Sequence, residues 1–268
     1  MNRIDARFQQ LREARQAAFI PFFTAGDPDL DVSLRIMRAA EDAGADLIEL
    51  GFPFSDPVAD GPTIQASYAR ALAGGQRVAD VLDLVRRARD GCALPIVAMV
   101  SYSIVFKLGF ENFLDRALDA GLDGATIPDL PVEEAAELFG PADERDFRLV
   151  CFVTPATTSS RVAMAVKHAR GFIYYISVRG ITGERSALPS DLAEQIQQLK
   201  AATSVPVAVG FGVSTPEQAA GVAMTADGVI VGSAIVKRMA QAAQEGKDAA
   251  DAALSFIRQL GVAVKDPR

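Results

Sequence analysis

The hydrophobic positions of this chain fall into short runs rich in Val, Ile and Phe, and an Ala-rich stretch with helical spacing follows each run. Alternating strand-like and helix-like segments are typical of βα units, in which a crossover helix follows each parallel strand. We expect strands over residues 18–23, 47–50, 95–100, 124–127, 149–153, 172–176, 205–209 and 228–231. We expect helices over residues 31–43, 78–90, 111–120, 132–139, 159–169, 191–201 and 216–223.

A weak internal repeat supports this division into βα units. Segments that end in aspartate recur where a helix closes and the next strand begins: Asp42-Ala-Gly-Ala-Asp46, Asp119-Ala-Gly-Leu-Asp123 and Thr225-Ala-Asp227. A glycine or another small residue suits this place because helices often end in a left-handed conformation. The repeat therefore predicts the same helix-to-strand connection at three places in the chain.

The spacing of the predicted strands favours a closed barrel in one domain. No linker rich in Ser, Gly or Pro and no block of charge divides the chain, so we expect residues 1–268 to form a single domain. Eight parallel strands can stay open as a doubly wound sheet or close on themselves, and even spacing favours closure. We predict a (β/α)₈ TIM barrel with extra helices at the N-terminal and C-terminal ends. Its chemistry should gather on the loops after the strands.

Composition and charge exclude several classes of partner. Half of the residues are hydrophobic and the formal net charge is -7 at pH 7. Such a chain can bury a large core, but its negative charge would repel a nucleic-acid backbone. The first apolar stretch, around residues 19–23, is too short for a signal peptide or a membrane span. We therefore expect a cytoplasmic protein that binds neither nucleic acid nor a membrane.

The reactive side chains narrow the chemistry further. The one histidine, His168, lies near the end of a predicted helix, and Cys92 and Cys151 are interpreted as ordinary thiols. With one histidine and no cysteine cluster, a histidine-based zinc site is excluded, and we expect no metal. His168 is expected on the side of the barrel away from the loops after the strands, so a Ser-His-Asp triad would lack its base. None of the six lysines ends a predicted strand, so a Schiff-base mechanism lacks its lysine. Acid–base chemistry is thereby left to carboxylates, lysine or tyrosine.

The second predicted strand ends in a candidate acid–base residue. Glu49 shares its strand parity with Leu47, so both point into the barrel if either does, with Glu49 nearer the mouth. Apolar neighbours should raise the pKa of such a carboxyl group toward neutrality, as a group that donates and accepts a proton requires. A salt bridge inside the barrel and an outward-facing surface glutamate remain as structural alternatives.

The loop after this strand carries a second candidate carboxylate, Asp60. Pro53, Pro57 and Pro62 restrict the loop and lower the entropy cost of ordering it over a ligand. An aspartate before a glycine more often serves a turn, and that interpretation stays open for Asp60. The turn interpretation suits Asp56 better than it suits Asp60.

Glycines after the last two strands predict a phosphate site. Residues 210–214 (GFGVS) follow the seventh strand, and residues 232–236 (GSAIV) follow the eighth and open a helix. Glycine lets the backbone approach an anion, and Ser233 and the first helical N–H groups can donate to it. Residues 180–185 (GITGER), after the sixth strand, form either a plain connector or a lid.

Taken together, five segments make the chain similar to the tryptophan synthase α-subunit family. They are residues 21–28 (PFFTAGDP), 49–57 (ELGFPFSDP), 60–65 (DGPTIQ), 180–183 (GITG) and 210–212 (GFG). The first three are specific in combination, whereas several phosphate-binding barrels share the last. The resemblance implies a carbon–carbon lyase that cleaves indole-3-glycerol phosphate to indole and D-glyceraldehyde 3-phosphate.

The resemblance also implies roles for individual residues. Glu49 becomes the acid–base and Asp60 the carboxylate that faces the indole nitrogen. The remaining expected site residues are Phe22, Ile64 and Phe211 in the indole pocket, Tyr174 in the site, Thr182 on the lid, and Gly183, Gly212, Gly232 and Ser233 around the phosphate.

A partner subunit is implied as well. The family pattern places a β subunit that carries pyridoxal phosphate against this chain, in an α₂β₂ heterotetramer, and no cofactor on the chain itself. The segment Pro128-Asp129-Leu130-Pro131 matches an implied contact, but Tyr102-Ser103-Ile104 lacks the amide that the family often has at its third position. Partner contact is therefore less well supported by the pattern than catalysis is.

Two other functions remain compatible with parts of the sequence. A different sugar-phosphate isomerase or synthase would account for the glycines and for one acid, but it would not require the Glu49 loop together with Asp60. A non-catalytic barrel that binds the substrate only to regulate a β subunit would not need Glu49, Asp60 and Thr182.

Overall fold

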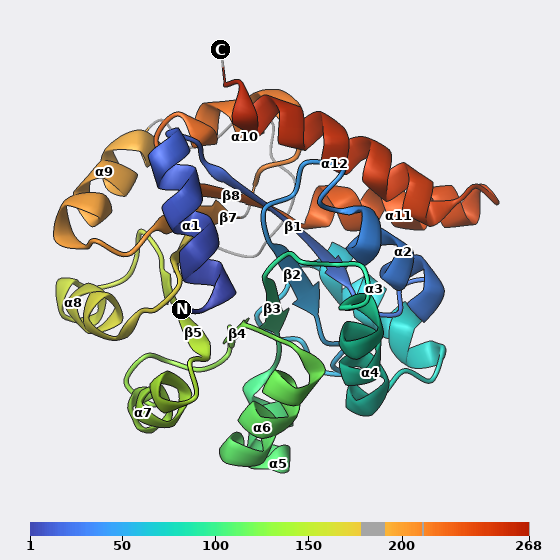
Figure 1. Cartoon of the computed structure of the whole chain (residues 1–268), viewed down its shortest axis with the longest axis horizontal. Coiled ribbons are helices and arrows are strands. Elements are labelled where there is room, and N and C mark those ends of the chain that lie inside the picture. The colour runs from blue at the N-terminus through green and yellow to red at the C-terminus, as the bar shows by residue number, and fades with distance from the viewer. Residues whose placement is uncertain (178–190, 211, 268) are drawn as a thin grey trace.

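A closed barrel of parallel strands forms the centre of the molecule (Figure 1). The computed structural model describes residues 1–177, 191–210 and 212–267. The strands follow one another around the barrel in chain order, and β1 closes it by pairing with β8. They are β1 (Ala18–Thr24), β2 (Ile48–Gly51), β3 (Ile96–Met99), β4 (Gly124–Thr126), β5 (Arg148–Val153), β6 (Ile173–Ile176), β7 (Val207–Gly210) and β8 (Gly228–Val231). Each overlaps a predicted run, so the predicted (β/α)₈ barrel is confirmed.

Helices surround the strands in Figure 1. They are α1 (Arg3–Ala14), α2 (Leu30–Ala39), α3 (Pro62–Ala73), α4 (Val78–Ala88), α5 (Tyr102–Leu108), α6 (Phe110–Ala120), α7 (Ala136–Glu144), α8 (Ser159–His168), α9 (Leu192–Ala202), α10 (Pro216–Ala223), α11 (Ser233–Gln244) and α12 (Ala249–Lys265). The expected extra terminal helices are α1 and α12, whereas α3 and α5 lie outside the predicted set. No helix within the described ranges is long and apolar enough to cross a membrane.

Helix α1 covers the end of the barrel at which the strands begin. Its buried side chains Ile4, Phe8 and Leu11 belong to the same apolar cluster as side chains of the barrel interior. The Phe8 and Phe172 ring centroids lie 5.7 Å apart. The N-terminal helix therefore closes this end with apolar contacts, which leaves the opposite end, where the strands finish, for a site.

The aspartates of the sequence repeat tie neighbouring strands together. Asp46, Asp123 and Asp227 each come just before a strand, and each carboxylate accepts a hydrogen bond from the backbone N–H of the preceding strand, at Phe19, Ile96 and Val207 respectively. Cations complete each site: Arg7 and Lys265 on Asp46, Arg3 and Arg89 on Asp123, and Lys200 on Asp227. The repeat thus encodes a recurring strand-to-strand clamp as well as a helix end.

The seventh helix departs from its prediction. The expected helix over residues 132–139 is α7, which starts later and runs from Ala136 to Glu144. Glu134 and Ala135 instead donate to the carbonyl oxygen of Pro131 in a turn. The helix continues past Pro141, although proline cannot donate a helical hydrogen bond, because Phe139 and Ala142 bury their side chains on the core face. Packing therefore overrides the local signal.

The cysteines are ordinary buried thiols, as expected, and His168, which was expected at the surface, packs partly against the core. Cys92 and Cys151 are free and buried. His168, the last residue of α8, is half-buried, and its ring stacks on Phe139 with centroids 4.7 Å apart. All three belong to the layer between strands and helices or to its edge, so none of them meets the carboxylates described below.

Candidate active site

Glu49 lies inside the barrel, as its parity with Leu47 predicts. Only 1% of the residue is exposed, and the Thr126 hydroxyl of β4 donates to its Oε1 at 3.0 Å. The adjacent strands pair it with Phe22 and Val97, which are apolar. No ion pair to Glu49 is present among the described residues. The surface position is therefore wrong, and the described part of the chain offers Glu49 no internal salt bridge.

This environment changes the acidity of Glu49. The pKa of the carboxyl group is raised to about 8: burial is the largest cause, the hydrogen bond from Thr126 lowers the pKa in part, and the negative charge of Asp60 raises it. Burial dominates because an ionised carboxylate loses its hydration inside the barrel. A group with a pKa near neutrality can donate and accept protons at the pH of a cell.

Asp60 faces the same region from the loop after β2. The Asp60 backbone N–H donates to the Pro57 carbonyl oxygen at 3.1 Å. The backbone carbonyl oxygen of Asp60 accepts from the side-chain amide of Gln65, in α3, at 2.8 Å. Burial, together with the charge of Asp129, raises the pKa of Asp60 to about 7. These turn bonds use only the backbone of Asp60, and the charge of its carboxylate acts on Glu49, Tyr68 and Tyr174.

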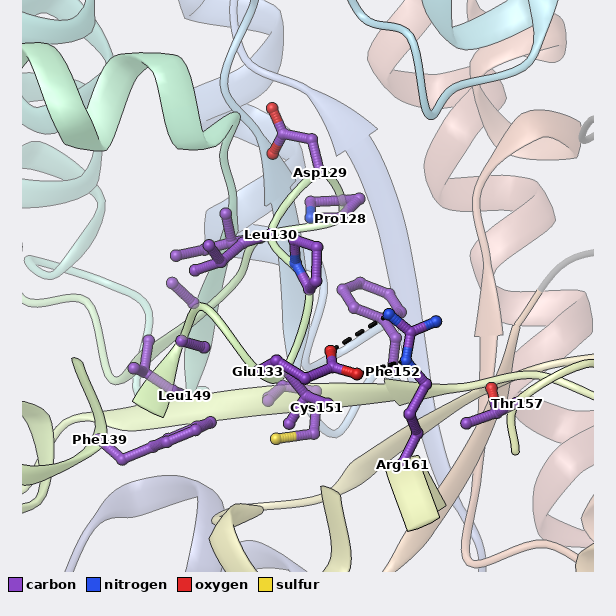
Figure 2. Close-up of a pocket in the computed structure, with 16 residues that line it drawn as sticks. Pro128, Asp129, Leu130, Glu133, Phe139, Leu149, Cys151, Phe152, Thr157 and Arg161 are labelled. Atoms are coloured by element: carbon purple, nitrogen blue, oxygen red, sulfur yellow. Dashed lines mark hydrogen bonds and ion pairs between the residues drawn. The ribbon is translucent and has the colours of Figure 1, made fainter. Parts of the chain in front are cut away.

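Asp129 marks the edge of this carboxylate cluster. Its two oxygens accept from the Ser101 hydroxyl at 2.6 Å and from the backbone N–H of Tyr102 at 2.7 Å. Asp129 borders a small hollow that it shares with Asp60 and Tyr68, and also a groove of about 300 Å³. Figure 2 shows that groove, where Glu133 and Arg161 pair while Asp129 points away from them. The segment after β4 therefore separates the carboxylates from the groove.

An apolar wall adjoins the carboxylates at the mouth of the barrel. Its members are buried side chains from β1, α3, β3 and α11: Phe22, Ile64, Tyr68, Met99 and Val236. Phe22 and Ile64 were predicted for the indole pocket, and the structure brings them together. Tyr68 and Met99 were missed. A prediction of α3 would have revealed Tyr68, because it lies one helical turn after Ile64 on the same face.

Tyr68 and Tyr174 place two phenols beside the carboxylates. Both side chains are buried, and burial together with the charges of Glu49 and Asp60 raises the pKa of each phenol well above its usual value. Tyr174 also packs against Phe152, with ring centroids 4.9 Å apart. The raised pKa favours the protonated phenol in both tyrosines, which suits them to hydrogen bonding beside the carboxyl groups.

Two glycines make room for the Phe22 ring. A β-carbon at Gly51 would lie 2.7 Å from the ring, and one at Gly232 would lie 2.9 Å from it. Gly51 ends the strand that carries Glu49, and Gly232 precedes helix α11. The Phe22 ring thus stands between the acid–base candidate and the start of α11, which brings the predicted catalytic and phosphate regions together.

The N-terminus of α11 carries the described part of the predicted phosphate site. Ser233 is its first residue, and no side chain in the described part of the chain caps the helix at Gly232. Gly212, after β7, has a φ of 83°, a conformation that favours glycine. Thr182, Gly183 and Phe211 lie outside the described residues. The structure therefore brings together Glu49, Asp60, Phe22, Ile64, Tyr174, Gly232 and Ser233.

Comparison with known proteins identifies the family. A family model described as tryptophan synthase alpha chain matches residues 8–265. The chain belongs to this family. Members of the tryptophan synthase alpha chain family from Geobacter sp. strain M21 and Geobacter sulfurreducens are 51% and 46% identical to it, over 88% and 98% of this chain and 89% and 99% of their own lengths.

Solved structures agree with the tryptophan synthase alpha chain assignment. The crystal structure of tryptophan synthase subunit alpha from Legionella pneumophila superposes with a TM-score of 0.92 at 35% identity, and the match covers 98% of each chain. A chain from a structure of Mycobacterium tuberculosis tryptophan synthase gives a TM-score of 0.89 at 34% identity, again over 98% of each chain. The family resemblance noted in the sequence is thereby confirmed.

Proposed function

We propose that this tryptophan synthase alpha chain family member cleaves indole-3-glycerol phosphate into indole and D-glyceraldehyde 3-phosphate. The observation that carries the proposal is the pair of carboxyl groups, buried Glu49 and half-buried Asp60, with pKa values of about 8 and 7 beside an apolar wall. An apolar wall suits an indole ring, and a helix N-terminus nearby suits a phosphate.

The cleavage needs an electron sink next to the carbon–carbon bond that breaks, and the substrate supplies its own. Protonation of indole C3 gives an indolenine, whose C=N accepts the electron pair of the breaking bond. Glu49 gives the C3 proton and takes the proton of the glycerol hydroxyl, which becomes the aldehyde. Asp60, as a carboxylate, stabilises the positive charge that develops at the ring nitrogen.

Indole release by the purified chain tests this function directly. Incubation with indole-3-glycerol phosphate should yield indole and glyceraldehyde 3-phosphate in equal amounts. A chain that binds the substrate without releasing indole would instead be a regulatory barrel, and release of an isomer of the substrate would indicate a different sugar-phosphate enzyme.

The phosphate should bind at the start of α11, where the Ser233 hydroxyl and the first helical N–H groups can donate to it. Ser233→Asp is expected to weaken the affinity for glycerol phosphate by about tenfold or more, because it places a carboxylate where the helix favours an anion. Calorimetry of Ser233→Asp beside Ser233→Ala separates charge from the loss of one hydroxyl. Equal affinities for all three proteins would place the phosphate elsewhere.

We infer that a tryptophan synthase β subunit, which carries pyridoxal phosphate, is the partner of this chain in the cytoplasm, in an α₂β₂ assembly. Support comes from the face that carries the site, where Val58 and Phe106 are each 75% exposed. Ile104, which replaces the amide of the family pattern, is only 9% exposed and packs into the core. The exposed apolar side chains suit a protein surface.

The β subunit is expected to accelerate cleavage by ordering the loop that carries Asp60 and the lid expected around Thr182. A partner that binds the form with both loops closed over the site about a hundredfold better than the open form contributes roughly 2.7 kcal/mol to closure. Indole release should be measured with and without the β subunit of the same organism. Equal rates at saturating partner, with binding shown independently, would mean that the barrel works alone.

A further inference from the structure

We propose that Thr126 is a positioning residue that serves Glu49 in both of its protonation states, an inference that rests on the proposed acid–base role of Glu49. The Thr126 hydroxyl lies between two acceptors. Its Oγ1 is 3.0 Å from Glu49 Oε1 and 3.4 Å from the carbonyl oxygen of Ala98 on the neighbouring strand.

The surroundings of Glu49 make this hydroxyl distinctive. Thr126 has no exposed surface and Glu49 has 1%, so bulk water does not solvate the pair. Adjacent strands β1 and β3 present apolar residues to Glu49. Within the part of the chain that the structure describes, the ionisable groups that act on Glu49 or feel its charge are Asp60, Tyr68 and Tyr174. Among the described residues, Thr126 is the one hydrogen-bond donor to the Glu49 carboxylate.

A hydroxyl can adapt to a proton transfer because it has one hydrogen and two acceptor lone pairs. With Glu49 ionised, the Thr126 hydrogen points to Oε1. With Glu49 protonated, the carboxyl O–H donates to Thr126 Oγ1, and the Thr126 hydrogen turns to the Ala98 carbonyl. Each state then keeps a partner for every buried polar hydrogen, which avoids the cost of an unsatisfied group.

This adaptation matters because Glu49 is proposed to give one proton and take another within a single turnover. A group that can only donate a hydrogen bond would stabilise the ionised carboxylate but could not accept from the protonated carboxyl group. Threonine is also branched at its β-carbon, so its rotamer is stiff in a strand and its oxygen stays in place while only the hydrogen moves. The carboxyl group is held in one position through both proton transfers.

Paired variants at position 126 test the proposal. Thr126→Val keeps the branched shape and removes the hydroxyl, whereas Thr126→Ser keeps the hydroxyl. For Thr126→Val we expect kcat for indole release to fall about tenfold to a hundredfold at neutral pH, the usual worth of a hydrogen bond to a charged group. KM should change little, and Thr126→Ser should restore most of the rate.

The pH dependence distinguishes positioning from packing. Thr126 partners both forms of Glu49 but stabilises the ionised carboxylate more, because its hydrogen bond lowers the Glu49 pKa. Loss of the hydroxyl should therefore raise the pKa of Glu49 and move the alkaline limb of the profile to higher pH. Should Thr126→Val fold poorly, Thr126→Ala carries the same test. A rate and a profile equal to those of the unmodified protein, or a Thr126→Ser as impaired as Thr126→Val, would overturn the proposal.

A substrate-free titration keeps this inference separable from the proposed function. The Glu49 carboxyl can be followed by ¹³C NMR in protein labelled at glutamate, with Glu49→Gln to assign the signal. An upward shift of its pKa in Thr126→Val and none in Thr126→Ser would support the role of Thr126 even if indole release failed. An unchanged pKa in an active Thr126→Val enzyme would reject Thr126 and leave the lyase function standing.

Discussion

Replacement of Glu49 with glutamine is expected to slow indole release by roughly 10²–10⁴-fold or more, the usual contribution of a positioned acid–base group. Glutamine keeps the size of the side chain and can still accept the hydrogen bond from Thr126, but it cannot exchange a proton at C3 of the indole. Because the change acts on the chemical step, kcat should fall while binding of glycerol phosphate stays the same.

Stability provides the control for this variant. Burial raises the pKa of Glu49 from 4.5 to about 8, so between these pH values the folded protein holds a proton that the unfolded chain has lost. Folding stability from this group therefore decreases as pH rises through the window. Glutamine removes the effect, and thermal unfolding at pH 8 should show the variant at least as stable as the unmodified protein. Near-normal indole release from the folded variant would remove Glu49 from its assigned role.

The pH profile of cleavage should reflect both carboxyl groups. The step needs Glu49 protonated and Asp60 ionised, so kcat/KM of the free enzyme should fall above about pH 8 and below about pH 7. The charge of Asp60 raises the pKa of Glu49, so the alkaline limb depends on the state of both carboxyl groups.

Replacement of Asp60 with asparagine should reduce kcat by roughly 10²–10³-fold, as expected for the loss of one preorganised electrostatic group at a developing charge. Asparagine can still accept a hydrogen bond from the indole N–H. It cannot balance the positive charge that appears on the ring nitrogen after protonation of C3. The acid limb of the pH profile, near pH 7, should also disappear in this variant.

Asp56 on the same loop offers a matched control. It is exposed, and its backbone carbonyl accepts a turn hydrogen bond from Val58 at 2.9 Å. Asp56→Asn removes the same charge from the same loop and should leave indole release within about twofold of normal. A similar loss in Asp56→Asn and Asp60→Asn would point to a general effect of loop charge instead of a direct role for Asp60.

The hydrophobic pattern predicts the barrel well because each strand has apolar residues on both faces and is followed by an amphipathic helix. The parity of Leu47 and Glu49 is a local property, so the sequence predicts that both side chains point the same way, and the structure shows that this way is inward. Helix α7 shows the limit of such reasoning: proline at position 141 argues against a helix, yet Phe139 and Ala142 gain enough burial to override it.

Contacts between distant strands were not predictable in the same way. Thr126 meets Glu49 across 77 positions of the chain, and only the register of β2, β3 and β4 places the two side chains together. Thr126 is nevertheless a polar residue in a buried strand, and that local signal would have singled it out. Tyr68 could have been predicted as a site residue only after α3 had been predicted. The prolines of the preceding loop and Gly61 made the start of that helix hard to recognise in the sequence.

The clamp at Asp46 has a consequence for synthesis on the ribosome. This carboxylate is 1% exposed and accepts from Arg7 in the first helix and from Lys265, the last residue of α12. All eight strands are complete once Val231 is made, yet Asp46 still lacks one of its two cations. A buried carboxylate without its full set of partners destabilises the structure around it. The nascent barrel therefore reaches its full stability only when residue 265 has left the exit tunnel, after the last strand has already been formed.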